Sequence, residues 1–105
     1  MRRVILESPY GGDIDRNVAY AKLCIADCVR RGEAPIASHL LFPGILDDLK
    51  PDERRLGMTA GHAWYAVAQA AVVYMDFGVS HGMQLGVGVA EEEHCPIERR
   101  YLSSA

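Results

Sequence analysis

The sequence has no long apolar run and no excess of basic residues. Its longest apolar stretch, around residues 66–75, is too short to cross a bilayer. The formal net charge is -3 at pH 7, so we expect no basic surface for nucleic acid or an anionic membrane. The N-terminus carries two arginines but only a short apolar core before Glu7, unlike a signal peptide. We therefore expect a cytoplasmic protein with neither kind of partner.

The sequence also has few cysteines, and their number is odd. An odd count of three without an export signal argues against a disulfide framework. Cys24 and Cys28 are four residues apart and share one face of a helix. Zinc would need two further ligands, and the nearest histidines in sequence are His39 and His62. We expect buried structural cysteines, and no metal or cofactor.

Internal repeats, linkers and low-complexity segments are absent as well. With 105 residues, the chain is predicted to form one domain over residues 1–105. A domain of this size buries only roughly 60–70% of its unfolded surface, which favours self-association. The helix that carries Trp64, Tyr65 and Val67 is too apolar for a surface that faces only solvent. We therefore expect a homodimer or higher homo-oligomer.

What is present is an alternation of apolar runs and amphipathic stretches. Asp13, Pro51 and Ser80 suit the starts of three helices. The order predicts a three-layer, Rossmann-like (flavodoxin-like) α/β sandwich around a small, mostly parallel four-stranded sheet. The expected strands are residues 3–7, 34–38, 71–76 and 96–101, and the expected helices are residues 13–31, 51–69 and 81–93.

In such folds the ligand crevice lies beyond the carboxyl ends of the strands, where the strand order reverses. The segments expected there are residues 8–13, 38–41, 76–80 and the loop after residue 93. Most of the polar, glycine-rich sequence falls in these segments. The pattern predicts a ligand site without naming the ligand.

The first of these segments, ESPYGGD, follows the first strand. Gly11 and Gly12 allow the backbone to approach a ligand closely, and the following helix offers free N–H groups. The segment is not GxGxxG, so the dinucleotide fingerprint is absent. Asp13 suits sugar hydroxyls better than phosphate, or is only the helix N-cap. Tyr10 either stacks on a base or a sugar or is a packing residue. Asn17 either holds ligand hydroxyls or hydrogen-bonds only the local loop.

The second segment is YMDFGVSHGM, residues 74–83. Asp76 is expected to end a buried strand and to point its carboxylate at the crevice. Gly78 permits a turn, Ser80 caps the next helix, and Gly82 allows close approach at its first turn. The segment suits phosphate or ribose recognition, or it is an ordinary strand–turn–helix.

His39 directly follows the second predicted strand. It either donates a hydrogen bond to a ligand, acts as an acid or base, or has a structural role. The predicted ligand-binding residues are Ser8, Pro9, Tyr10, Gly11, Gly12, Asp13, Asn17, His39, Asp76, Gly78, Ser80, Gly82 and Met83.

These segments together resemble a small family of bacterial and phage proteins. The resemblance rests on SPYGGD, GEAPIASHLL, the helix carrying Trp64, VVYMDFGVSHGM and PIERRYL. That family is similar to the nucleoside 2-deoxyribosyltransferase-like superfamily. The first loop of those enzymes matches at Ser8, Gly11 and Gly12, and the stretch before their last helix matches at Ser80 and Gly82. The resemblance implies a nucleoside or nucleotide ligand. It also implies N-glycosidic chemistry in which a glutamate attacks the anomeric carbon.

The catalytic carboxylates of that superfamily do not carry over. The glutamate position falls on Gly86, and the aspartate position of related hydrolases falls near Gly61. One hypothesis is therefore a nucleoside- or nucleotide-binding protein without the usual nucleophile. A second is an enzyme that uses Asp76, Asp13 or a neighbouring subunit's carboxylate, with His39 as acid. A third is a non-catalytic protein-interaction domain.

Overall fold

The structure is a computed structural model that describes residues 1–104. A four-stranded, fully parallel sheet has the order β2-β1-β3-β4. Its strands are β1 (Arg2–Glu7), β2 (Glu33–Ile36), β3 (Ala70–Tyr74) and β4 (Ile97–Arg100). The connecting helices are α1 (Ile14–Arg30), α2 (Pro51–His62) and α3 (His81–Glu92), with short 3-10 helices η1 (Ser38–Leu40), η2 (Ala63–Ala66) and η3 (Leu102–Ser104). The predicted fold class is confirmed.

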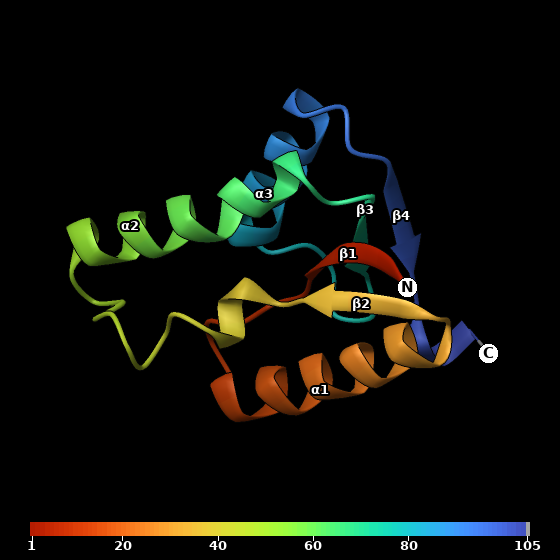
Figure 1. The fold of residues 1–105 in the computed structure, drawn as a ribbon. Helices are drawn as coiled ribbons and strands as arrows, with labels where there is room; N and C mark the ends of the chain where they lie inside the picture. The colour runs from red at the N-terminus through yellow and green to blue at the C-terminus, as the bar shows by residue number, and fades with distance from the viewer. Residues whose placement is uncertain (105) are drawn as a thin grey trace.

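The helices form two layers around the sheet, with α1 on one face and α2 and α3 on the other (Figure 1). Successive side chains of a strand point to opposite faces. Val4 and Leu6 pack in the core under α1, whereas Ile5 packs in the second core with Tyr65 and Ala90. The strand order reverses between β1 and β3, so the crevice expected of such a sheet lies beyond the carboxyl end of β1.

Helix α1 begins at a cap that the sequence predicts. The side chain of Asp13 accepts a hydrogen bond from the Arg16 amide at 3.1 Å. Residues spaced by three and four positions then face the sheet, among them Cys24 and Cys28. Both cysteines are free and fully buried in the core, as expected from the sequence.

Two predicted elements end earlier than expected. Helix α2 stops at His62, not at Gln69, and continues only as η2. The reason is that Gln69 joins β1: its amide donates to the Arg3 carbonyl at 2.8 Å and its side chain accepts from the Arg3 amide. Strand β3 ends at Tyr74, so Asp76 lies in the turn beyond it, which Gly78 closes. Within residues 1–104, no helix is long and apolar enough to cross a membrane.

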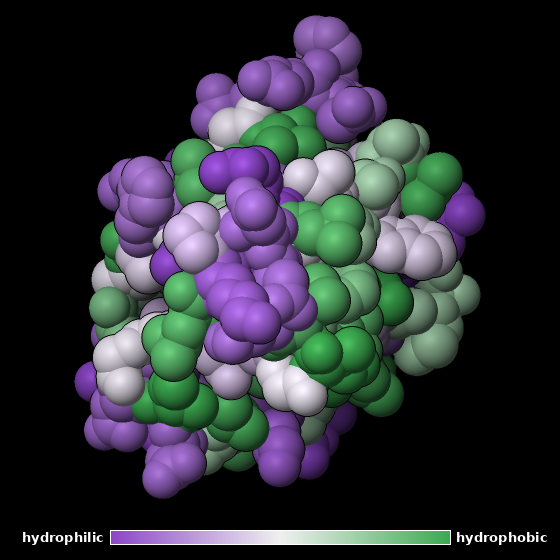
Figure 2. Space-filling view, turned by 90° about the vertical axis from the view of Figure 1, so that its left-hand side faces the viewer, coloured by the Kyte–Doolittle hydropathy of each residue, from purple (hydrophilic) through white to green (hydrophobic). Residues whose placement is uncertain are grey.

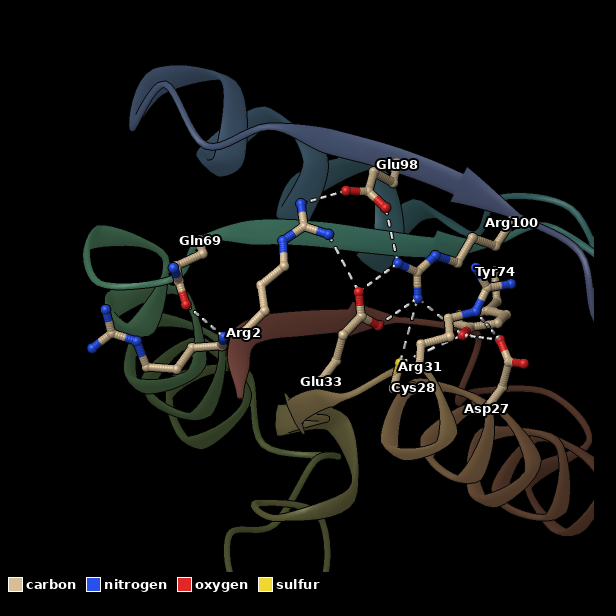
Figure 3. Close-up of polar contacts among 10 residues, drawn as sticks. Arg2, Asp27, Cys28, Arg31, Glu33, Gln69, Tyr74, Glu98 and Arg100 are labelled. Carbon is tan, nitrogen blue, oxygen red and sulfur yellow. Dashed lines mark hydrogen bonds and ion pairs between the residues drawn. The ribbon is translucent and has the colours of Figure 1, made fainter.

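A network of charged side chains ties the two edges of the sheet on the α1 face (Figure 3). Arg100 of β4 donates two 2.7 Å hydrogen bonds to the Glu33 carboxylate of β2. Arg2 of β1 pairs with Glu33 and with Glu98. Because Arg100 and Glu33 are both buried, this network belongs to the core and lies at the end of α1 away from the crevice loops.

Candidate functional site

A cavity of about 350 Å³ opens beyond the carboxyl ends of β1 and β2. Small-molecule sites commonly have volumes of about 300–1,000 Å³. Its walls come from the end of β1 and its loop, from η1 and the segment after it, from α2, and from the first turn of α3. The lining residues are Glu7, Ser8, Tyr10, Gly11, Ser38, His39, Phe42, Pro43, Leu46, Asp48, Glu53, Arg54, Gly57, Met58, His62, Ser80, His81, Gly82 and Met83.

The segment between η1 and α2 forms one wall of this cavity. It projects on the left of Figure 1, and Figure 2 shows that side of the molecule, where hydrophobic patches alternate with hydrophilic ones. Phe42 and Leu46 of this segment line the cavity. Its neighbours Leu41, Ile45 and Leu49 are exposed instead.

Glu7 is the most deeply buried carboxylic acid of the cavity. It is the last residue of β1, its residue exposure is 8%, and its Oε1 accepts a 2.6 Å hydrogen bond from the Tyr65 hydroxyl. Burial raises the pKa of Glu7 from 4.5 to about 7, although the bond from Tyr65 acts in the opposite direction. Among the described residues, no arginine, lysine or histidine pairs with it. The cavity therefore contains a carboxyl group that titrates near neutral pH.

Helix α3 leaves room for this carboxyl group. A methyl group at Gly86 would lie 2.6 Å from Cδ of Glu7, far inside van der Waals contact. The side chain of Glu7 thus occupies the space that any side chain at position 86 would need. Strand β1, and not helix α3, supplies the carboxyl group at this place.

Ser8 and His39 form a second polar pair in the cavity. Ser8 Oγ lies 2.7 Å from His39 Nε2, which joins the β1 loop to η1. Burial lowers the pKa of His39 to about 4, so the imidazole is uncharged at neutral pH. An uncharged imidazole both donates and accepts a hydrogen bond, which suits hydroxyl groups of a ligand.

Asn17 fixes the backbone of the loop between β1 and α1. Its Nδ2 donates 2.9 Å hydrogen bonds to the carbonyls of Tyr10 and Gly11. Asn17 is fully buried and so positions the loop without lining the cavity, the second of the two roles that the sequence left open. Gly12 has a φ of 89°, a conformation that favours glycine.

The predicted ligand residues divide into two groups. Those that the structure brings together around the cavity are Ser8, Tyr10, Gly11, His39, Ser80, Gly82 and Met83. Those that do not belong to its lining are Pro9, Gly12, Asp13, Asn17, Asp76 and Gly78. Asp13 caps α1, and Gly78 has the positive φ that its turn requires.

Asp76 has a structural role and is not a lining residue of this cavity. The sequence had predicted that its carboxylate would point at the crevice. Its carboxylate accepts hydrogen bonds from the Tyr20 hydroxyl at 2.6 Å, the Leu102 amide at 2.9 Å, and the amide and hydroxyl of Ser103. Burial alone would raise the pKa of Asp76, but these bonds together lower it to about 2. Asp76 therefore fastens η3 to α1 as a fully ionised group.

Replacing Asp76 with alanine should reduce the free energy of unfolding by about 2 kcal/mol. A hydrogen bond to a charged group contributes about 1.5–3 kcal/mol. Two of the bonds that Asp76 accepts are only partly buried and the two from Ser103 are exposed, so we expect the total loss to be no larger than one such bond. Urea unfolding at pH 7 measures the effect. Asp52→Ala, which breaks only the exposed pair with Arg55, is the control and should change stability by under about 1 kcal/mol. Equal losses in both variants would contradict the structural role.

Some cavity residues were missed by the sequence analysis. Glu7 had a usable signal, because it ends a parallel strand and alternates with Leu6, which faces α1. That alternation places Glu7 on the α2/α3 face at the carboxyl end of β1. Residues from α2, such as Arg54 and Met58, had no local signal, because they reach the cavity only through the crossover of α2.

The remaining expectations concern metal and self-association. Within residues 1–104, no three histidine, cysteine, aspartate or glutamate side chains gather as metal ligands would. Tyr65 is buried against Glu7, so it is not part of an outer apolar surface, whereas Trp64 and Val67 are about half exposed. Self-association of the chain stays a prediction.

Comparison with known proteins assigns the chain to a family and relates its fold to a solved structure. No curated protein matches it significantly. A solved structure of a 2-deoxyribosyltransferase from Bacillus psychrosaccharolyticus is similar, with a TM-score of 0.68 and 12% identity. The match covers 98% of this chain and 74% of that one, and it shows a shared α/β fold. The model of the family described as Domain of unknown function (DUF7768) matches residues 2–100. The chain belongs to this family and has a deoxyribosyltransferase-like α/β fold.

Proposed function

We propose that this protein binds a nucleoside in the cavity beyond β1 and β2. The observation that carries the proposal is the cavity itself, which lies where ligands bind in open parallel sheets and has the volume of a small-molecule site. Aromatic rings of Tyr10 and Phe42 offer surfaces for a base. The uncharged Ser8–His39 pair offers hydrogen bonds to sugar hydroxyls. The likeness in fold to a 2-deoxyribosyltransferase supports the same ligand class.

The charges of the cavity favour a nucleoside over a nucleotide. The lining residues include the carboxyl groups of Glu7, Asp48 and Glu53 but only one guanidinium, that of Arg54. His39 is uncharged at neutral pH and adds no positive charge. A phosphate would meet a site with an excess of acidic groups, which opposes its binding.

The experiment is a binding titration with the deoxynucleosides, the ribonucleosides and their 5′-monophosphates, followed by thermal shift and calorimetry. One nucleoside should stabilise the protein, with a gain of about 2.7 kcal/mol at a hundred times the dissociation constant. Its monophosphate should bind more weakly.

Two glycines of α3 provide a matched pair of variants. Gly82 lines the cavity, whereas Gly88 lines only the neighbouring groove between α2 and α3. Neither has an atom within 4 Å of an added Cβ. Gly82→Leu should weaken nucleoside binding at least about tenfold because the side chain enters the cavity, whereas Gly88→Leu should leave binding unchanged. Undiminished binding in Gly82→Leu, or no stabilisation by any compound, would contradict the proposal. The second result would favour a protein-interaction domain.

A further inference from the structure

The starting point is the uncompensated burial of Glu7. Ionised carboxylates inside proteins are normally paired with a cation or held by several donors, because burial otherwise disfavours the charge. The other buried glutamate, Glu33, follows this rule through Arg100 and Arg2. Glu7 has one recorded donor, the Tyr65 hydroxyl, among the described residues. A structural role does not explain this arrangement, since an apolar or amide side chain would fill the same place with less penalty.

The position of the group matters as much as its burial. Glu7 is a lining residue of the cavity and is next in sequence to Ser8, which meets His39 there. Helix α3 has glycine at position 86, so nothing on that helix displaces the group. The carboxyl group thus lies between η2 and α3, on a residue that lines the cavity.

We propose that Glu7 is the catalytic carboxylate of this cavity and that it cleaves the N-glycosidic bond of a bound nucleoside. The proposal rests on the proposed function, because it requires a nucleoside in the cavity. An oxygen of Glu7 forms a bond to C1′ of the sugar as the bond from C1′ to the base nitrogen breaks. The electron pair of that bond leaves with the base, which takes a proton from water. Water then hydrolyses the glycosyl ester, so the products are free base and free sugar.

The surroundings of Glu7 suit this role. A carboxylate with a single hydrogen-bond donor is less stabilised than one in water and is the more reactive nucleophile. Its raised pKa near 7 leaves a large ionised fraction at pH 8. The two carboxylates considered from the sequence are less suitable, because Asp76 is held by η3 and Asp13 caps α1. Base release should therefore rise with pH through about 7.

The test measures base release by chromatography and nucleoside binding by calorimetry on the same samples. Glu7→Gln should bind the nucleoside within a few-fold of the natural protein and release base at least about 100-fold more slowly. Gly86→Ala should also slow release, because the methyl group displaces the carboxyl group, whereas Gly88→Ala should not. Asp13→Asn, which keeps an N-cap outside the cavity, should retain full activity. Mass spectrometry of acid-quenched samples should detect a glycosylated Glu7 peptide.

The outcomes separate the two proposals. Nucleoside binding without base release by the natural protein would overturn the catalytic role and leave the binding function intact. Base release by Glu7→Gln at the natural rate, or release that falls as pH rises through 7, would also overturn it. An absence of binding would remove both proposals together.

Discussion

Glu7→Gln is expected to raise the free energy of unfolding by about 3 kcal/mol at pH 8 and to leave it nearly unchanged at pH 4. Folding shifts the pKa of Glu7 from 4.5 to about 7, and each unit corresponds to about 1.4 kcal/mol. A raised folded-state pKa means that the folded protein binds the proton more tightly. The stability of the natural protein therefore falls as pH rises from about 4.5 to 7. Glutamine keeps the shape and the bond from Tyr65 but cannot ionise.

Urea unfolding of both proteins between pH 4 and pH 9 measures this difference. Glu91→Gln, the same change at an exposed position of α3, is the control for replacing a carboxyl group with an amide. The stability difference between Glu7→Gln and the natural protein should change with pH. A constant difference would show that folding does not raise the pKa of Glu7. A stabilising substitution at a cavity residue would also fit a group that is kept for activity at the expense of stability.

Arg100→Met is expected to reduce the free energy of unfolding by about 3–5 kcal/mol, the range found when one partner of a buried ion pair is removed. Arg100 and Glu33 have side-chain exposures of 7% and 5%, and both oxygens of Glu33 accept from Arg100 (Figure 3). The substitution leaves the Glu33 carboxylate buried with Arg2 as its remaining cation, at 3.3 Å. The loss should lie toward the lower end of the range for this reason.

A double variant distinguishes the buried charge from lost packing. Arg100→Met together with Glu33→Leu should be more stable than Arg100→Met alone, because it removes the buried carboxylate that has lost its main partner. Arg55→Met breaks an exposed pair with Asp52 and serves as the control, with an expected change under about 1 kcal/mol. Urea unfolding at pH 7 gives all four values. A loss in Arg100→Met no larger than in the control would show that the network does not stabilise the core.

The fold was predictable because its signals are local. Each strand is a short apolar run, and Asp13 and Ser80 cap helices where the sequence indicates. The end of α2 was not predictable in this way, since it depends on the pairing of Gln69 with Arg3, 66 residues away. Boundaries that depend on distant partners carry no mark in the local sequence.

The candidate site was predictable only where the loops supply it. Ser8, Tyr10 and His39 follow strands directly and do line the cavity. Asp76 also follows a strand, but the chain returns at η3 and binds its carboxylate, a contact that spans 26 residues. Glu7 was overlooked because it belongs to a strand and not to a loop. Its alternation with Leu6 would have placed it on the cavity side.

The closeness of Glu7 and Gly86 also has an evolutionary consequence. A side chain at position 86 would force the carboxyl group of Glu7 to move, because both need the same space. Among relatives with this fold, the two positions should therefore covary, with larger residues at one accompanying smaller residues at the other. The two positions form an epistatic pair, and a change at either is best judged together with the other.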